Sequence, residues 1–315
     1  MNYLYNVTLP FSNSEIYYRE LSSKDQLNLS KINVLFPSNE DKTNTLDYIK
    51  LLKNIISNCI ENTDVFSDLN IIEYVLFITK LRIVSIGNEL ILTLNVDKED
   101  KKEDVKITID LNFFMKCLYD TFMEALQDNI LIYKNISVEL DWPKLKYERE
   151  LLKAKNNSEV LDSIMFFIKT IKTNDDKVIE FSNFEINNIK EIYNKLPLSL
   201  KNLIENKVIK MINHLSNKNL FGIKWMDGFS FNFYNSSYDR FMRYMFSGNL
   251  RNIYQEYYIL ASRNINPLYV DTLSIADRTV YCSFVEEEMK AREENNNNDD
   301  SGNITDLQKL INEFE

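Results

Sequence analysis

The residues able to carry out acid–base or metal chemistry are few and widely separated. The chain holds one histidine, His214, and three cysteines, Cys59, Cys117 and Cys282. A zinc site needs several Cys or His ligands at short spacing, and a hydrolytic triad needs a histidine beside a nucleophile. His214 falls near the end of a predicted helix, where histidine usually interacts with the last carbonyl groups. Each cysteine lies in an apolar stretch, which is typical of small buried side chains in a reducing compartment. We predict no metal, no cofactor and no catalytic centre.

Two further patterns have the wrong spacing for ligand binding. Glu286, Glu287 and Glu288 are consecutive, and consecutive residues of a helix point in different directions, so their carboxylates do not converge on one cation. We expect a solvated helix face there. Only five glycines are present, and no two lie close enough to build a phosphate-binding loop, which excludes P-loop and dinucleotide fingerprints.

Aromatic residues and arginines concentrate between Phe229 and Tyr258. This composition is typical of protein–protein interfaces, and we select Arg251, Tyr254 and Tyr257 as candidate partner-binding residues. Stacking on single-stranded nucleic acid is an alternative use of such aromatics. The net charge of −10 argues against it, because nucleic-acid binding needs clustered Lys and Arg. Core packing explains at least half of these aromatic residues.

The length and composition describe an ordinary folded protein. The chain has 315 residues, of which 44% are hydrophobic, and this length favours about two domains. No apolar stretch reaches the roughly 20 residues of a membrane span, and the N-terminus does not have the pattern of a signal peptide.

The first 143 residues alternate between helical and strand periodicity and predict an N-terminal α+β domain. Leu90–Val96 and Val105–Leu111 alternate with period two around a charged connection, which predicts an antiparallel hairpin whose apolar face packs on the helix over Asp68–Leu81. Pro143 closes this domain. The other predicted elements are strands over Tyr5–Leu9, Glu15–Leu21 and Ile130–Leu140, a helix that follows an N-cap at Ser22 and Ser23 and runs to about Leu35, and helices over Thr45–Glu61 and Asn112–Leu126.

Residues 144–294 predict a mainly helical domain with a small β insertion, so the whole chain is α+β and mainly helical. The β elements are Lys177–Phe181 and Leu220–Phe233, the second with a turn at Asp227 and Gly228. Helices are predicted over Leu151–Lys155, Glu159–Lys172, Glu185–Leu196, Leu198–Leu215, Ser237–Phe246, Asn249–Arg263 and Ser274–Glu294.

The last part of the chain predicts a disordered linker over residues 295–303, rich in Asn, and an amphipathic helix over residues 304–315. The apolar residues of that helix fall on one stripe, namely Ile304, Leu307, Leu310, Ile311 and Phe314. So short a helix is marginal in water by itself. We expect its stripe to dock either on its own chain or on a neighbouring protein, and both alternatives stay open.

Several segments resemble the T-even-type phage baseplate family, the hub-associated assembly proteins of contractile tails. They are Tyr17–Leu21, Ile71–Phe77, Leu81–Gly87 with the following hairpin, Leu196–Leu200, and Asn249–Tyr254 with the long helix ending at Glu288. Members of the family often carry Cys-x-x-Cys pairs near the hairpin tip and after the Leu-Pro helix. This chain has none there, so any metal binding of relatives is not carried over.

The resemblance implies a non-enzymatic component of the virion, located in the tail baseplate and assembled in the host cytoplasm. Its expected partners are other baseplate hub and wedge proteins, with a second copy of the chain as a further candidate. A structural subunit and a transient assembly chaperone are both compatible with this resemblance. An enzyme with an unrecognised site is the least favoured reading, because Gly and His are so scarce.

Overall fold

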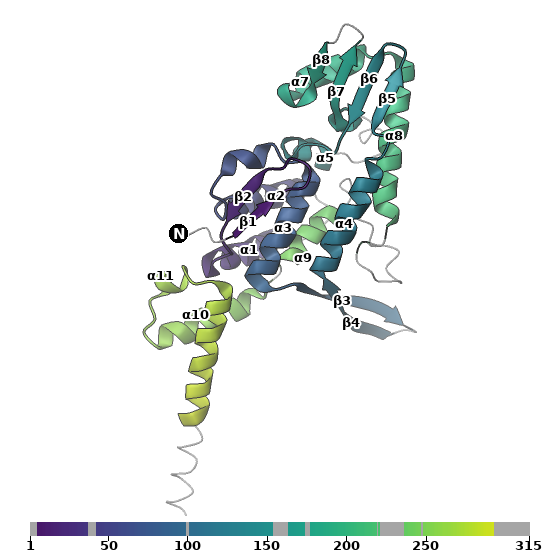
Figure 1. Ribbon diagram of the computed structural model, residues 1–315. Coiled ribbons are helices and arrows are strands. Elements are labelled where there is room, and N and C mark those ends of the chain that lie inside the picture. The colour runs from purple at the N-terminus through teal and green to yellow at the C-terminus, as the bar shows by residue number, and fades with distance from the viewer. Residues whose placement is uncertain are drawn as a thin grey trace, which may run out of the picture. The chain divides into compact units, whose positions relative to one another are not determined.

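The computed structural model describes residues 5–36, 42–98, 101–153, 163–173, 177–218, 220, 236–246 and 248–292 (Figure 1). The protein is α+β and mainly helical, with small antiparallel sheets, as predicted. It divides into two compact units. The first unit comprises Met1–Glu20 and Leu29–Ser247, and the second comprises Leu21–Asn28 and Gly248–Glu315.

The N-terminal part of the first unit is built around a buried helix. Strands β1 (Tyr5–Thr8) and β2 (Glu15–Tyr18) form a two-stranded antiparallel sheet, followed by α1 (Ser23–Leu35) and α2 (Lys42–Ser57). Helix α3 (Ile71–Ile86) is buried on nearly every side, as its apolar sequence predicts. It also continues five residues beyond the predicted end at Leu81.

A buried carboxylate organises the start of α3. Asn70 caps the helix and forms a capping box with Glu73, whose Oε2 accepts a hydrogen bond from the Asn70 backbone. The Oε1 atom of Glu73 accepts hydrogen bonds from the backbone N–H groups of Phe11 at 3.0 Å and Ser12 at 2.7 Å. These contacts satisfy a fully buried acid and hold the β1–β2 loop against α3.

The predicted hairpin is present, and its strands are longer than expected. β3 (Glu89–Lys98) pairs with β4 (Lys101–Asp110) through the charged run that was predicted to be a connection. The backbone register places Asp97 opposite Lys102. The base of one face is buried, through Leu90, Leu92, Ile107 and Ile109.

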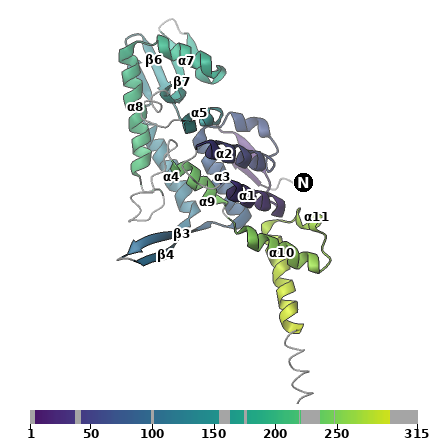
Figure 2. The same ribbon diagram turned by 180° about the vertical axis from the view of Figure 1, so that it is seen from behind.

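The helical neighbours of this hairpin differ from the prediction. Among the helices, β3 contacts mainly α9 (Ser236–Met245) and β4 contacts mainly α4 (Leu111–Ala125), where the sequence predicted the helix over Asp68–Leu81. The rings of Phe114 on α4 and Phe241 on α9 lie 5.0 Å apart, which joins these two helices beside the hairpin. The hairpin itself extends away from the helices (Figures 1 and 2).

A four-stranded antiparallel sheet has the order β5-β6-β7-β8. Its strands are β5 (Ile130–Tyr133), β6 (Ile136–Leu140), β7 (Ile168–Thr173) and β8 (Val178–Glu180). The prediction of a helix over Glu159–Lys172 is wrong for its described part, which is a 3-10 helix over Ile164–Phe167 followed by β7. A short apolar run fits a buried helix or a buried strand equally well. Here the segment forms a strand because it pairs with β6.

The sheet crosses the predicted domain boundary at Pro143, because β6 precedes that proline and β7 follows it. Helix α5 (Glu148–Lys153) lies between them in the chain, and α7 (Ile186–Lys195) and α8 (Leu198–Asn217) come after the sheet. Helix α8 runs beside β5 and α4 (Figure 1). Pro197 separates α7 from α8, as predicted. The predicted β segment with its turn at Asp227 and Gly228 lies outside the described residues.

The second unit is helical. It contains α10 (Leu250–Ser262), the short α11 (Pro267–Val270) and a helix over residues 275–292. An antiparallel bridge joins Ser22 to Ser274, which attaches the segment Leu21–Asn28 to these helices. The predicted linker at 295–303 and the predicted helix at 304–315 lie outside the described residues.

Candidate partner-binding surface

The second unit has a small core around a buried arginine. Leu260, Val270, Cys282 and Val285 form its apolar cluster. Beside this cluster Arg278 donates a hydrogen bond from Nε to Oε2 of Glu256 at 2.7 Å, and its Nη2 donates to Gln26. The guanidinium also lies over the ring of Tyr257, 5.8 Å from its centroid. Arg278 thus connects α10, the helix over 275–292 and the segment Leu21–Asn28.

One predicted partner-binding residue, Tyr257, faces this interior. Its hydroxyl donates a hydrogen bond to Oδ1 of Asp271 at 3.0 Å, and burial raises the pKa of the phenol, with Asp271 adding to the effect. Asp271 also lies 3.8 Å from Nζ of Lys24. Tyr257 therefore positions the loop after α11. Its role in a partner contact stays a prediction.

The other two predicted residues of α10 lie on its exposed side. Arg251, Tyr254 and Tyr258 recur at i, i+3 and i+7, which places them on one stripe of the helix. About half of Tyr254 is exposed, and Tyr258 is 76% exposed. We call Arg251, Tyr254 and Tyr258 the α10 stripe. The sequence analysis missed Tyr258, because periodicity alone does not reveal which side of a helix the core covers.

A second exposed apolar group follows on α11 and the last helix. Leu268 and Tyr269 on α11 are exposed, as are Tyr281 and Phe284 on the helix over 275–292. The side chains of Tyr269 and Tyr281 are hydrogen-bonded to each other, and this bond raises the pKa of Tyr269. Large exposed apolar residues in neighbouring positions mark interaction sites more often than scattered ones do. The sequence placed Tyr281 and Phe284 on a helix without indicating their exposure.

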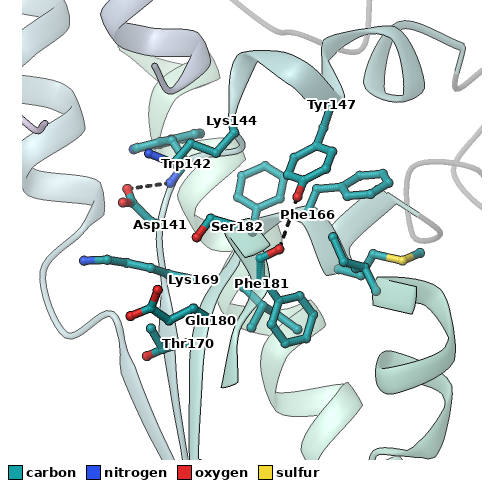
Figure 3. Close-up of a pocket in the computed structure, with 14 residues that line it drawn as sticks. Asp141, Trp142, Lys144, Tyr147, Phe166, Lys169, Thr170, Glu180, Phe181 and Ser182 are labelled. Atoms are coloured by element: carbon teal, nitrogen blue, oxygen red, sulfur yellow. Dashed lines mark hydrogen bonds between the residues drawn. The ribbon is translucent and has the colours of Figure 1, made fainter. Parts of the chain in front are cut away.

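The first unit contains a pocket of about 170 Å³ under the four-stranded sheet (Figure 3). Trp142, Tyr147, Phe166 and Phe181 provide much of its apolar lining, and Asp141, Lys169 and Glu180 lie across from Tyr147 and Phe166.

The polar groups of this pocket are engaged within the protein. Nζ of Lys169 contacts Oε1 of Glu139 at 2.8 Å, and the backbone N–H of Trp142 donates to Oδ1 of Asp141 at 2.7 Å. Burial raises the pKa of Asp141. Lys169 and Asp141 at the rim of the pocket thus have hydrogen-bond partners within the protein.

His214, the single histidine of the chain, has a partner within the protein. His214 lies in the last turn of α8, and its Nε2 is 3.0 Å from Oε2 of Glu124, which also accepts a hydrogen bond from Lys218 at 2.8 Å. Hydrogen bonds from Lys218 and then His214 lower the pKa of Glu124. The partner of His214 is thus a carboxylate, where the sequence predicted helix carbonyls.

Glu288, from the run of three glutamates, is ion-paired, and two of the cysteines are buried. Glu288 pairs with Arg292 at 2.5 Å and with Arg263 at 3.9 Å. Cys59 and Cys282 are buried, and burial raises the pKa of Cys282 to about 11. Among the described residues, no group of three or more His, Cys, Asp or Glu could hold a metal ion. No helix in the same part of the chain is long and apolar enough to cross a membrane.

Comparison with known protein families identifies the family of this chain. The family model described as T4 bacteriophage base plate protein matches residues 2–220, which is more than two thirds of the sequence. The chain belongs to this family and is a phage baseplate protein, so the resemblance drawn from the sequence is confirmed. No curated protein and no solved structure is significantly similar to the chain. The α10 stripe lies outside the matched residues.

Proposed function

We propose that the protein is a structural subunit of a contractile tail baseplate that joins hub and wedge proteins through protein–protein contacts. The observation that carries this proposal is the family match over residues 2–220. In this proposal the protein is a non-enzymatic virion component, assembled in the host cytoplasm, with no cofactor and no nucleic-acid or membrane partner. The internally paired rim of the pocket and the hydrogen bond between His214 and Glu124 support a binding role over catalysis.

The contact to a neighbouring baseplate protein is proposed to run through the α10 stripe. Tyr and Arg are enriched among interface residues that dominate binding energy, because they combine a large apolar area with hydrogen-bonding groups. Tyr257 supports this surface from behind, through its hydrogen bond to Asp271. A second copy of the chain is the other partner that such a surface fits.

The surface is tested by comparing two variants for incorporation into particles. Replacing Tyr254 and Tyr258 together by Ala removes the two exposed rings, and we expect incorporation to fall at least about tenfold, since loss of such residues commonly costs over 1 kcal/mol each. Gln255→Ala changes an exposed neighbour on the same helix and is the matched control. Normal incorporation of the double variant would contradict the proposed contact.

The alternative is a transient assembly chaperone that leaves before the particle is complete. The same family description covers this alternative, since it names the baseplate and not a role within it. Presence in finished particles at a fixed stoichiometry separates the two, because only a structural subunit is retained.

A further inference from the structure

Strand β5 is an edge strand of the four-stranded sheet, and β6 is its only neighbour in that sheet. The backbone N–H of Leu140 donates a hydrogen bond to the carbonyl of Asn129 at 2.9 Å. Bonded and non-bonded residue pairs alternate in an antiparallel ladder, so every second residue after Asn129 bonds to β6. The residues between them, Ile130 and Ile132, therefore direct their backbone N–H and C=O groups away from β6. Within the described residues, no third element is hydrogen-bonded to these groups.

The side chains of Ile130 and Ile132 are exposed on one face of this edge. They are 58% and 76% exposed, while Val138 on the other face of the sheet is buried. Helix α8 also contacts β5, but it leaves the face of the two isoleucines open. Edge strands are commonly protected from pairing by a lysine, a proline or a bulge. β5 is short, but it contains none of these, so it offers both unpaired backbone groups and apolar side chains to another strand.

The two ends of β5 carry opposite charges. Asp128 precedes the strand and Lys134 follows it, and both residues have positive φ angles, of 56° and 52°, which end the extended backbone. If two copies of β5 pair antiparallel, the aspartate of each copy comes to the end that carries the lysine of the other. A parallel pairing would bring like charges together instead. The charges therefore favour a second copy of β5, in the antiparallel direction.

One register of this pairing satisfies the backbone of both copies. A twofold axis at Leu131 places Ile130 of each copy opposite Ile132 of the other. Both residues direct their N–H and C=O groups outward, so the two pairs exchange four backbone hydrogen bonds. Their side chains lie on the same face, where four isoleucines come together across the strands. The contact is isologous, which is the usual symmetry of a dimer.

We infer that β5 pairs with β5 of a second copy of the chain, which joins two four-stranded sheets into one eight-stranded sheet. Strand addition of this kind draws its affinity from backbone hydrogen bonds and its specificity from alternate side chains. The strand has only four residues, so the contact area is small and the dimer is weak. The inference concerns the isolated protein and does not depend on the proposed joining of hub and wedge proteins. A strand of another baseplate protein is the competing occupant.

Analytical ultracentrifugation of the full-length protein tests this inference. We expect monomer at about 1 µM and a substantial fraction of dimer at about 100 µM. Ile132→Pro removes an outward N–H without removing a hydrogen bond to β6, and it should weaken dimerisation at least about tenfold. The matched control is Val178→Pro on β8, the opposite edge strand. The backbone of Val178 also points outward, because the N–H of Thr173 bonds to the carbonyl of Lys177, and this variant should dimerise normally.

A second variant tests the pairing without altering the backbone of the strand. Lys134→Asp places an aspartate in an exposed turn, at a positive φ angle that Asp adopts readily. It brings like charges together at both ends of the paired strands, so dimerisation should weaken several-fold while the thermal transition stays in place. This variant keeps the test decisive if Ile132→Pro disturbs the sheet.

Three results would overturn the inference. Monomer at every concentration up to about 300 µM would leave the edge to a different protein. A dimer of unchanged strength in both Ile132→Pro and Lys134→Asp would place the contact elsewhere, for example on the α10 stripe. Equal weakening by Val178→Pro would show a general effect of edge prolines on the sheet. None of these results bears on incorporation into particles, which tests the proposed function separately.

Discussion

Arg278 and Glu256 form a 2.7 Å ion pair in the second unit, with the arginine side chain only 2% exposed and the glutamate side chain 30% exposed. The pair joins the helix over residues 275–292 to α10, and the same guanidinium lies over Tyr257. The two helices that carry exposed aromatic residues are thus fixed to each other by a buried charge. Their apolar cluster alone is small.

Replacing Arg278 by Met should destabilise the second unit by about 2–3 kcal/mol. Removing one member of a fully buried pair costs about 3–5 kcal/mol, and partial exposure of Glu256 lowers the expected value. Chemical denaturation measures the free energy of unfolding. The control is Arg292→Met, which removes an exposed pair with Glu288 and should change stability by less than about 0.5 kcal/mol. Equal effects of the two variants would contradict the structural role of Arg278.

The hairpin β3–β4 offers a comparison between its two faces. Ile107→Ala removes a buried side chain and should cost about 2–5 kcal/mol, because it leaves a cavity at the base of the hairpin. Ile91→Ala removes a side chain that is 58% exposed on the other face and should cost under about 0.5 kcal/mol. Denaturation of both variants gives the difference. Small and equal effects would mean that the period-two pattern does not mark a buried face.

Stability should fall at alkaline pH through a buried tyrosine of the first unit. Burial raises the pKa of Tyr147 to about 12, above the value of about 10 in an unfolded chain. Between these values the unfolded state binds fewer protons than the native state, so the free energy of unfolding decreases as pH rises. The contribution is fully present below about pH 10 and amounts to at most about 2–3 kcal/mol.

The variant Tyr147→Phe isolates this effect. It loses the hydrogen bond to the carbonyl of Phe181, which changes stability equally at pH 8 and at higher pH while the tyrosine stays neutral. The decrease in unfolding free energy between about pH 10 and 12 should be shallower in the variant. Part of the decrease should remain, because burial also raises the pKa of Tyr18 to about 12. An unchanged pH dependence would rule out Tyr147 as a source.

The protein should fold without a bound metal ion. The sequence offers no cluster of Cys and His, and the described residues hold no group that could bind a metal. Dialysis against EDTA should therefore shift the melting temperature by less than about 1 °C. Stoichiometric zinc in the purified protein, together with loss of the thermal transition after its removal, would contradict this prediction.

The sequence predicted elements whose pattern is local and failed where distant pairing decides. Helix α3 was predicted because a long apolar run fits a buried helix, and Pro197 marked the break between α7 and α8. Strand β7 was missed, because its identity depends on pairing with β6 about thirty residues earlier.

Prediction of the candidate partner-binding surface from the sequence also failed where packing between distant segments decides. Arg251 and Tyr254 were selected from composition, and they lie on the exposed side of α10. Composition could not separate Tyr257, which contacts Asp271, from its neighbour Tyr258, which is exposed. That distinction depends on where α11 and Arg278 pack, and no local pattern in the sequence encodes it.

Quantitative mass spectrometry of purified phage particles tests most directly whether the protein is a retained baseplate subunit. The structural role predicts peptides of the chain in finished particles, at a fixed ratio to the other baseplate proteins across preparations. The same peptides should persist in baseplates isolated from those particles. Absence from finished particles, with presence in assembly intermediates, would contradict the structural role and assign the protein to assembly.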